Sequence, residues 1–269
     1  MRLFPTRSAE CPLAGQRILV TRAEDQAGEL SERLRVLGAE PIPCATIRTA
    51  PPADWSPLDT GIDQLSSYDW VIFTSANGAR YFFERAASRG HATAALHDLK
   101  VGAVGRATAR ALGRHGIRVD FVPDEYVAEA LVAGIGDVAG QRILLPRADI
   151  ARRALADGLA AKGALVDDVV AYRTLPADPA DCGLLVGATT PLAVDIATFT
   201  SASTVRNFVA LLGERSPREV LAGAIIACIG PITAHAAEEA GLHVDILAPE
   251  HTLEGLLRAI ITFLEEQRL

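Results

Sequence analysis

The sequence repeats itself at a fixed spacing, and this repeat constrains the fold more than any other feature. Residues 15–22 (GQRILVTR) match residues 140–147 (GQRILLPR), 125 positions later. Residues 101–135 and 226–260 share 11 identities in 35 positions at the same offset. The block DWVIFTSA, at 69–76, has its counterpart 126 positions later. Because the blocks keep one order and nearly one spacing, the chain is expected to contain two similar halves.

Each half predicts short buried strands that alternate with amphipathic helices. Residues 17–21 form an apolar run typical of a buried strand, and the apolar residues of 24–37 recur at helical spacing. Further strands are expected at 70–73, 101–104 and 119–122, and further helices at 78–87, 107–114 and 126–135. Residues 51–66 and 176–193 are turn-rich and predict loops. This alternation indicates the α/β class, with parallel sheets and helices on both faces.

Two extended stretches that end in proline leave two domain arrangements open. Residues 41–51 and 169–176 both read as strand-like linkers, and they align at the repeat offset. In a tandem arrangement the domains are residues 15–135 and 140–260. In a crossed arrangement the chain passes between the domains at both linkers, so that the halves exchange their first strand–helix unit.

Composition narrows the class of protein and its partners. Hydrophobic residues make up 49% of the chain, which is enough for a sizeable core. The formal net charge of -7 argues against nucleic acid and anionic membranes, both of which favour a basic surface. No apolar stretch is long enough for a transmembrane helix, and none near the N-terminus resembles a signal peptide. We therefore expect a soluble, cytoplasmic protein with no nucleic-acid or membrane partner.

The cysteines and histidines predict no metal site. Cys11, Cys44, Cys182 and Cys228 include no Cys-x-x-Cys pair, and the six histidines form no cluster with metal-ligand spacing. Four reduced, mostly buried thiols are expected, as is usual in the cytoplasm.

The expected carboxyl ends of the strands carry one class of residue. Each is a small hydroxyl, glycine, proline or arginine, in the pairs Thr21-Arg22, Thr74-Ser75, Gly105-Arg106, Pro146-Arg147, Thr200-Ser201 and Gly230-Pro231. Ligands of open parallel sheets bind beyond these ends, where helix N-termini favour anions. Serine and threonine also cap helices, so each pair alone has a structural explanation. Six such turns together predict a site for a polyanion, although the whole chain is acidic. The acidic residues gather instead on predicted helices, for example at 24–32 and 238–239.

Several common catalytic motifs are missing. The chain has no phosphate-binding loop and no nucleophile elbow, and the segment from Gly102 to Gly105 lacks the third glycine of a dinucleotide fingerprint. No histidine, cysteine or carboxylate is expected at most strand ends. Such a site can bind and orient an anion without a cofactor, but it offers no obvious general base or nucleophile.

The order and spacing of several short motifs resemble the uroporphyrinogen-III synthase family. The resemblance runs from about residue 15 to 262 and is carried by 19–22 (LVTR), 73–77 (FTSAN), 104–108 (VGRAT), 145–147 (LPR), 172–174 (YRT), 199–201 (FTS), 229–231 (IGP) and 252–255 (TLEG). It implies two flavodoxin-like three-layer domains with parallel sheets, joined by a two-stranded linker. Domain 1 would be residues 1–45 and 175–269, domain 2 residues 50–168, and the linkers 42–50 and 169–176. We choose the crossed arrangement on this resemblance.

The resemblance also implies the reaction. The enzyme would be a cofactor-free lyase that closes hydroxymethylbilane, a linear tetrapyrrole, to uroporphyrinogen III with inversion of ring D and loss of water. Loss of the terminal hydroxyl gives an azafulvene, and attack at the substituted carbon of ring D gives a spiro-pyrrolenine that reopens and recloses inverted. The pyrrole nitrogens supply the electrons, so little acid–base chemistry is required. A cleft between two domains with many hydrogen-bond donors would hold the carboxylates. We expect a monomer.

The family's residues carry over position by position. Tyr172 matches the tyrosine proposed to assist departure of the hydroxyl as a hydrogen-bond donor; read without the family, it is an ordinary strand tyrosine. The carboxylate-binding hydroxyl positions correspond to Thr74, Ser75, Thr108, Ser201 and Thr233. Further candidates for substrate binding from the same motifs and turns are Asn77, Gly105, Thr200 and Gly230. Positive charge makes Arg22, Arg106 and Arg147 candidates as well. Ile232 departs from the family's consecutive threonines and can offer only its backbone N–H.

Two other functions fit parts of the sequence. A non-catalytic two-domain module would use the same strand ends to bind a small polyanion but would catalyse no reaction. A nucleotide-dependent α/β enzyme would need a phosphate loop, which the chain lacks.

Overall fold

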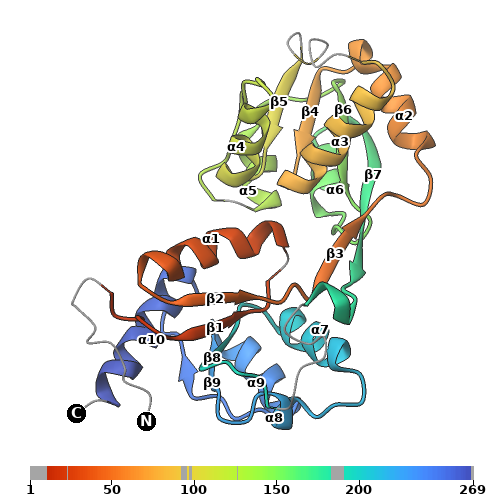
Figure 1. Ribbon diagram of the computed structural model, residues 1–269. Helices are drawn as coiled ribbons and strands as arrows, with labels where there is room; N and C mark the ends of the chain where they lie inside the picture. The colour runs from red at the N-terminus through yellow and green to blue at the C-terminus, as the bar shows by residue number, and fades with distance from the viewer. Residues whose placement is uncertain are drawn as a thin grey trace. The chain divides into compact units, whose positions relative to one another are not determined.

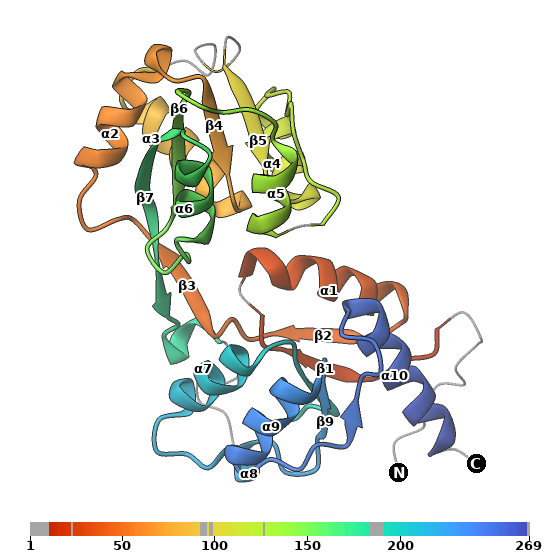
Figure 2. The same ribbon diagram turned by 180° about the vertical axis from the view of Figure 1, so that it is seen from behind.

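Two compact α/β units make up the part of the chain that the structure describes (Figures 1 and 2). The computed structural model describes residues 11–22, 24–91, 96, 99–125, 127–182 and 191–267. Unit 1 takes the described residues up to Arg48 and from Leu175 on, and unit 2 takes those within Thr49–Thr174. Tyr126, where the sequence predicts the start of a helix, lies outside the described residues.

Unit 1 contains a five-stranded parallel sheet in the order β10-β9-β8-β1-β2. Its strands are β1 (Arg17–Val20), β2 (Glu40–Pro43), β8 (Ile196–Phe199), β9 (Ile225–Cys228) and β10 (Ile246–Leu247). Counted along the chain, the spatial order is second, first, third, fourth, fifth. The direction of winding therefore reverses between β1 and β8, which pair in parallel with Ile18 opposite Ile196.

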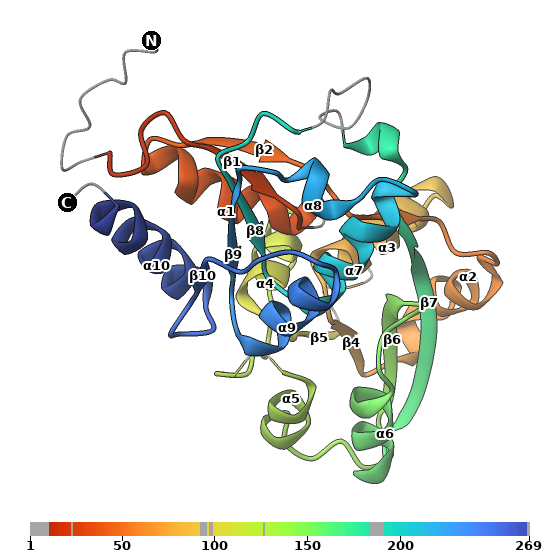
Figure 3. The same cartoon turned by 90° about the horizontal axis from the view of Figure 1, so that it is seen from below.

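Helices cover both faces of this sheet. The helices of the unit are α1 (Glu24–Val36), α7 (Ala202–Leu212), α8 (Pro217–Val220), α9 (Pro231–Glu239) and α10 (Leu253–Glu266), with a 3-10 turn η3 (Pro179–Asp181). Successive residues of β1 point to opposite faces: Leu19 packs in the core with α7 and α9, and Ile18 and Val20 in the core with α1 and α10. Figure 3 shows α7 and α9 side by side on their face.

Unit 2 contains a second sheet in the order β3-β7-β6-β4-β5. Its strands are β3 (Ile47–Ala50), β4 (Trp70–Phe73), β5 (Lys100–Ala103), β6 (Arg142–Ala148) and β7 (Leu165–Pro176). The pairs β4–β5, β4–β6 and β6–β7 are parallel. The prediction of an α/β fold with mainly parallel sheets is confirmed.

The second sheet is also covered on two faces. Its helices are α2 (Ser56–Asp63), α3 (Ala76–Ser88), α4 (Arg106–Arg114), α5 (Ala128–Gly134) and α6 (Ala154–Ala161), with a 3-10 turn η1 (Leu65–Ser67). Val71 and Phe73 of β4 pack with α2, α3 and α4, whereas Trp70 and Ile72 pack with α5 and α6. Figure 1 shows α3 in front of β4, and Figure 2 shows α6 in front of β6 from behind.

The repeat explains why the two sheets are alike. Strands β6, β7, β4 and β5 are the counterparts of β1, β2, β8 and β9 at the repeat offset, and the two sets occupy the same order in their sheets. The strand–helix–strand segment from Arg17 to Pro43 pairs with strands of the second half of the chain, and the segment from Arg142 to Pro176 pairs with strands of the first. The unit boundaries fall within β3 and β7, which are hydrogen-bonded neighbours.

Some predicted elements differ from the structure. The strand expected at 119–122 is only an isolated bridge between Gly102 and Phe121. The predicted loop at 51–66 contains α2, which starts with Pro57 in its first turn and buries Leu58 and Ile62. Its two apolar residues are too few to give a clear helical period in the sequence.

The prediction that all four cysteines are reduced is wrong for two of them. Cys44 and Cys182 form a disulfide with 4.5 Å between their Cα atoms, although 138 residues separate them. One follows β2 and the other follows η3, so the return of the chain after β7 brings them together. Cys11 and Cys228 are free thiols, and burial raises the pKa of the Cys228 thiol to about 12.

Candidate functional site

The carboxyl ends of the parallel strands form one edge in each sheet, and the predicted site residues lie at these edges. In parallel strands every strand ends on the same side, so turns that are distant in the sequence become neighbours. Unit 1 carries Arg22, Thr200, Ser201, Gly230 and Thr233. Unit 2 carries Thr74, Ser75, Asn77, Gly105, Arg106, Thr108, Arg147 and Tyr172.

In unit 2 the structure brings Ser75 and Tyr172 together. Ser75 is the N-cap of α3, and its Oγ accepts a hydrogen bond of 2.9 Å from the Gly78 N–H. The same Oγ lies 3.0 Å from the Tyr172 hydroxyl, and either oxygen can be the donor. The contact joins the turn after β4 to β7, which are separated by 97 residues in sequence.

A bulge in β7 sets the direction of Tyr172. Arg147 of β6 pairs with Val170, whereas the next residue, Ala148, pairs with Tyr172, so β7 has one extra residue at this point. Such a bulge interrupts the alternation of side chains. Ala171 and Tyr172 are consequently both buried in the α2–α3–α4 core, at 0% and 7% exposure. The Tyr172 ring stacks on Tyr81 of α3, with centroids 5.5 Å apart and planes 8° apart.

The other predicted residues of unit 2 surround the starts of α3 and α4. Thr74 and Asn77 flank the Ser75 cap and are half-buried. Gly105 is the N-cap of α4 and has no side chain to close the helix end, and Arg106 is exposed at its first position. The N–H groups of a helix's first turn have no partner within the helix and favour anions. Thr108 is only 4% exposed, which leaves its hydroxyl little surface to offer a ligand.

The sequence predicts that Arg147 lies in a turn at the end of a strand. In the structure it lies within β6, which continues to Ala148. Its guanidinium makes a two-pronged ion pair with Asp168 of the neighbouring β7 and donates to the Arg152 carbonyl at 2.5 Å. The side chain is 6% exposed. The expectation that Arg147 presents its charge to a ligand disagrees with this placement, because the charge is already balanced inside the unit.

In unit 1 the turn after β8 repeats the helix cap of unit 2. Ser201 caps α7 in a reciprocal capping box with Thr204 and also contacts Ser203 Oγ at 2.8 Å. Thr200 directly precedes Ser201, and Arg22 follows β1, the strand next to β8 in the sheet. Both residues are half-buried. No tyrosine corresponds to Tyr172 here, because its counterpart at the repeat offset is Ile47.

The start of α9 is the counterpart of the start of α4. Gly230 is its N-cap, and Thr233, the counterpart of Thr108, is also 4% exposed. Ile232 is 78% exposed in the first turn of the helix. Its backbone N–H is the only hydrogen-bond donor that this residue has, as the sequence indicates.

Carboxylates of both units lie at the opposite, amino edge of the sheets. Four aspartates each accept a hydrogen bond of 2.7–2.8 Å from the backbone N–H of a strand start: Asp195 from Arg17, Asp69 from Arg142, Asp120 from Val101 and Asp245 from Ile226. Asp69 and Asp195 are counterparts in the two halves of the repeat, as are Asp120 and Asp245. These four of the 33 acidic residues therefore stabilise the strand starts, away from the carboxyl edge.

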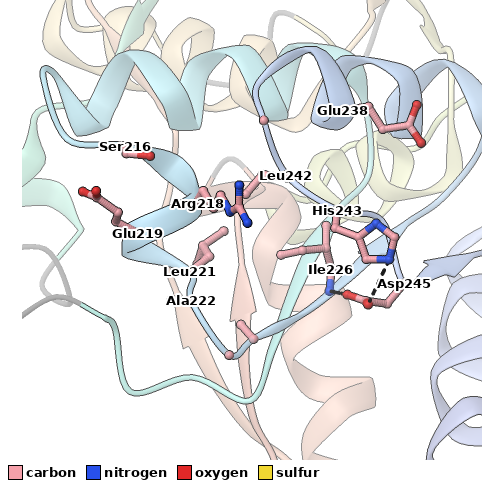
Figure 4. A pocket seen from close by; sticks show the side chains of 13 residues that line it. Ser216, Arg218, Glu219, Leu221, Ala222, Ile226, Glu238, Leu242, His243 and Asp245 are labelled. Atoms are coloured by element: carbon pink, nitrogen blue, oxygen red, sulfur yellow. Dashed lines mark hydrogen bonds and ion pairs between the residues drawn. The ribbon is translucent and has the colours of Figure 1, made fainter.

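The pocket in Figure 4 belongs to this amino edge of unit 1. It lies beside the starts of α8 and β9 and includes Glu219, Glu238 and Asp245 in its lining. Figure 4 shows Asp245 between the Ile226 N–H and His243, whose Nε2 is 3.9 Å from the carboxylate. Its lining has three carboxylates against one arginine, Arg218, and one histidine, His243, so acidic groups outnumber basic ones and a polyanion is disfavoured.

Two residues at the Ser75–Tyr172 contact, Gly78 and Tyr81, are not predicted from the sequence. A Cβ at Gly78 would lie 3.1 Å from the Pro146 carbonyl oxygen and 3.3 Å from Ser75 Oγ, so a glycine allows this close packing. Tyr81 supports the Tyr172 ring and donates to Thr49 Oγ1 at 3.3 Å. Ser75, Gly78 and Tyr81 follow one another at intervals of three residues, which places them near one face of α3. This pattern can be recognised only when the start of the helix is known.

Within the described residues, no group of three or more His, Cys, Asp or Glu side chains could hold a metal ion. In the same part of the chain no helix is long and apolar enough to cross a membrane.

Comparison with known proteins finds relatives that are similar in sequence and in fold. A family model described as uroporphyrinogen-III synthase HemD matches residues 28–258. A uroporphyrinogen-III synthase of Synechococcus elongatus is 36% identical over 260 residues, which cover 94% of this chain and 97% of that protein. Among solved structures, a mutant uroporphyrinogen III synthase of Thermus thermophilus covers 94% of this chain and 100% of its own (TM-score 0.54, 22% identity). The uroporphyrinogen-III synthetase of Helicobacter pylori covers 92% and 98% (TM-score 0.55, 17% identity) and, like the former, shows likeness of fold alone. With the family model spanning most of its length and a relative of this identity covering nearly all of it, the chain belongs to the uroporphyrinogen-III synthase family.

Proposed function

We propose that the chain converts hydroxymethylbilane into uroporphyrinogen III and water, the reaction of its family. The observation that carries this proposal within the structure is the Tyr172 hydroxyl, held 3.0 Å from Ser75 Oγ at the carboxyl edge of the unit 2 sheet. Family membership supports the reaction, and the tyrosine at this edge supports the assignment of the group that assists its first step.

The reaction needs only one proton donor near the departing hydroxyl. The bond between carbon and the terminal hydroxyl breaks with its electron pair on oxygen, while the pyrrole nitrogen supplies electrons to the carbon. Tyr172 donates a hydrogen bond to the leaving oxygen. The proton that completes the water is balanced by the one lost from the pyrrole N–H, which leaves a neutral azafulvene. A carbon–carbon bond to the substituted carbon of ring D then forms the spiro-pyrrolenine, which reopens and recloses inverted.

The strand-edge turns would bind the carboxylates of the substrate. We assign this role to residues with exposed or half-buried positions or with helix N–H groups beside them: Arg22, Thr74, Asn77, Gly105, Arg106, Thr200, Ser201 and Gly230. Ser75 would contribute through its backbone N–H, because its hydroxyl already contacts the Gly78 N–H and Tyr172. Thr108 and Thr233 would contribute chiefly through backbone N–H groups at the starts of α4 and α9. We leave Arg147 out because Asp168 balances its charge.

We further propose that the two units are flavodoxin-like domains, with domain 1 formed by residues 1–45 and 175–269 and domain 2 by residues 50–168. The order second, first, third, fourth, fifth of the unit 1 strands supports this, because it is the flavodoxin-like order. In that order the ligand binds at the point where the winding reverses, which in unit 1 lies between β1 and β8.

A monomer in the cytoplasm is the form that we propose for the working enzyme. Each unit completes its own strand edge with residues of one chain, so no second copy is needed to supply a turn. Analytical ultracentrifugation at assay concentrations tests the monomer, and cell fractionation tests the compartment.

The change Tyr172→Phe tests the assigned residue. We expect kcat for hydroxymethylbilane to fall about 10²-fold, since this is a typical contribution of a positioned proton donor. Affinity for the product should stay the same, because the ring and its stacking on Tyr81 are kept. An unchanged kcat would contradict the role of Tyr172, and loss of product affinity alone would make it a binding residue.

A further inference from the structure

The Ser75 hydroxyl makes a contact that helix capping does not require. As a cap, Ser75 Oγ needs only to accept from the Gly78 N–H, which it does at 2.9 Å. Its second contact, 3.0 Å to the Tyr172 hydroxyl, is made to another element of unit 2. A serine oxygen that has accepted one hydrogen bond still has its own hydrogen to give. The question is therefore which of the two hydroxyls donates.

The geometry around Ser75 favours serine as the donor. A hydroxyl that accepts a hydrogen bond becomes a stronger donor, because the chain of bonds polarises it. Gly78 N–H belongs to the first turn of α3, where the helix dipole places partial positive charge. A donor at this place stabilises negative charge on the Tyr172 oxygen, which grows as the phenol hydrogen is drawn toward a leaving group.

The Tyr172 ring is held so that one hydroxyl contact can fix its direction. The ring is 7% exposed, stacks on Tyr81 and stands on the β7 bulge. A hydroxyl at the end of a fixed ring can turn only about its C–O bond. If Ser75 donates to Tyr172 Oη, the phenol hydrogen must point away from Ser75.

The repeat supplies an internal comparison. Ser201 caps α7 just as Ser75 caps α3, but its hydroxyl contacts Ser203 and Thr204 of its own helix. The contact between a capping serine and a tyrosine is thus a feature of unit 2 and does not follow from the shared fold.

We propose that Ser75 is a positioning residue for Tyr172: the Gly78 N–H donates to Ser75 Oγ, Ser75 donates to Tyr172 Oη, and the phenol hydrogen is thereby directed at the departing hydroxyl of the substrate. No bond to Ser75 is made or broken, and its hydrogen stays on its oxygen. The structure gives the first hydrogen bond and the 3.0 Å contact of the second, whose direction we infer from the hydrogen bond that Ser75 accepts from the Gly78 N–H. The last hydrogen bond, to the substrate, rests on the proposed function.

Kinetics of three variants test the proposal. Ser75→Ala removes both contacts, and Ser75→Thr keeps a hydroxyl. The control Asp137→Ala removes a comparable hydrogen bond of unit 2, from the Ala139 N–H to Asp137 Oδ1 at 3.0 Å, in the turn between α5 and β6. We expect Ser75→Ala to lower kcat at least 10-fold with KM unchanged, and Ser75→Thr to restore kcat to within about threefold of wild type. Asp137→Ala should also lose the stability of one side-chain-to-backbone hydrogen bond, without a fall in kcat.

A spectroscopic measurement on the full-length folded protein without substrate separates this proposal from the proposed function. With 3-fluorotyrosine incorporated, the ¹⁹F resonance of Tyr172, assigned by its loss in Tyr172→Phe, should move in Ser75→Ala and stay in Asp137→Ala. An unmoved resonance together with unchanged kcat would overturn the positioning role. A rise in KM at constant kcat would also overturn it and make Ser75 a carboxylate ligand. A moved resonance in a protein whose wild type never turns over hydroxymethylbilane would overturn the proposed function, and with it the last link of the chain.

Discussion

At the scale of single residues, Arg147 illustrates what a linear pattern does not reveal. Its position at a strand end and its counterpart Arg22 predict an anion-binding side chain. Asp168, which takes up its charge, belongs to a neighbouring strand, and this pairing depends on the register of β6 with β7. The counterpart of Asp168 at the repeat offset is Pro43, so the repeat gives no hint of an ion pair. Register across a sheet is invisible in one sequence, and the role of Arg147 could not be predicted from it.

The Arg147–Asp168 pair should contribute to stability far more than a surface pair. Removing one partner of a buried pair leaves the other charge uncompensated, so we expect Asp168→Asn to lower the free energy of unfolding by about 3 kcal/mol. The matched control is Asp157→Asn, which breaks the exposed pair with Arg153 and should cost less than about 0.5 kcal/mol. Urea unfolding of both variants measures the difference. Equal losses would contradict the structural role that we give to Arg147.

The disulfide gives a second prediction about single residues. Alkylation of the denatured, unreduced protein should modify two cysteines, Cys11 and Cys228, and alkylation after reduction should modify four. In the native state only Cys11 should react, because Cys228 is buried and its pKa is raised to about 12. Mass spectrometry counts the modified sites. Four reactive cysteines in the unreduced, denatured protein would show that the disulfide does not form.

At the scale of elements, strongly periodic segments were predictable and short ones were not. The helix expected at 24–37 is α1 at Glu24–Val36, and the strand expected at 70–73 is β4 with the same bounds. Helix α2 was missed because it is short and is held by contacts with α3. Those contacts include apolar packing and two ion pairs, Asp59 with Arg85 of α3 and Asp63 with Arg89, the C-cap of α3, both at 2.7 Å.

The contact between α2 and α3 should make stability depend on acidic pH. Hydrogen bonds from the Arg85 guanidinium hold the pKa of Asp59 below its ordinary value of 3.8. A lowered pKa in the folded state stabilises the fold above the ordinary value, and this stabilisation is lost as the pH falls through the folded value. We therefore expect the free energy of unfolding to begin to decrease below about pH 5 and to go on decreasing until the pH has passed the folded pKa of Asp59, which lies below 3.8.

Substitution of Asp59 isolates this contribution. Asp59→Asn should cost on the order of 1 kcal/mol at pH 7 and nothing at the acidic end, so its stability curve should converge with that of wild type. Glu84→Gln, in an exposed pair with Arg80, is the control and should leave the curve nearly unchanged. Parallel curves for wild type and Asp59→Asn would contradict the assignment. Chemical denaturation across this pH range supplies the data.

At the scale of the whole molecule, the repeat predicted two similar halves but not how the chain connects them. The tandem and crossed arrangements have the same strands and helices, and they differ only in which sheet receives the first strand–helix unit. In the structure β1 pairs with β8 and β6 pairs with β4, which is the crossed connection. The preference for it came from the family resemblance, since a periodic pattern carries no information on long-range pairing.

Unit 2 should fold without the rest of the chain. The unit spans a single range of the chain, Thr49–Thr174, and its described residues form cores on both faces of its sheet, whereas unit 1 needs two separate ranges. We expect a fragment of residues 49–174 to unfold cooperatively in urea and to show native-like circular dichroism. A fragment that unfolds without a cooperative transition would contradict the proposal that this unit is a domain.

The most direct test of the central claim is the isomer composition of the product made from hydroxymethylbilane. The substrate also cyclises spontaneously, without inversion of ring D, to the type I isomer. The wild-type chain, incubated with freshly generated hydroxymethylbilane, should yield the type III isomer as the main product, measured by chromatography after oxidation to the porphyrins. Formation of the type I isomer alone, at the rate seen without protein, would contradict the account.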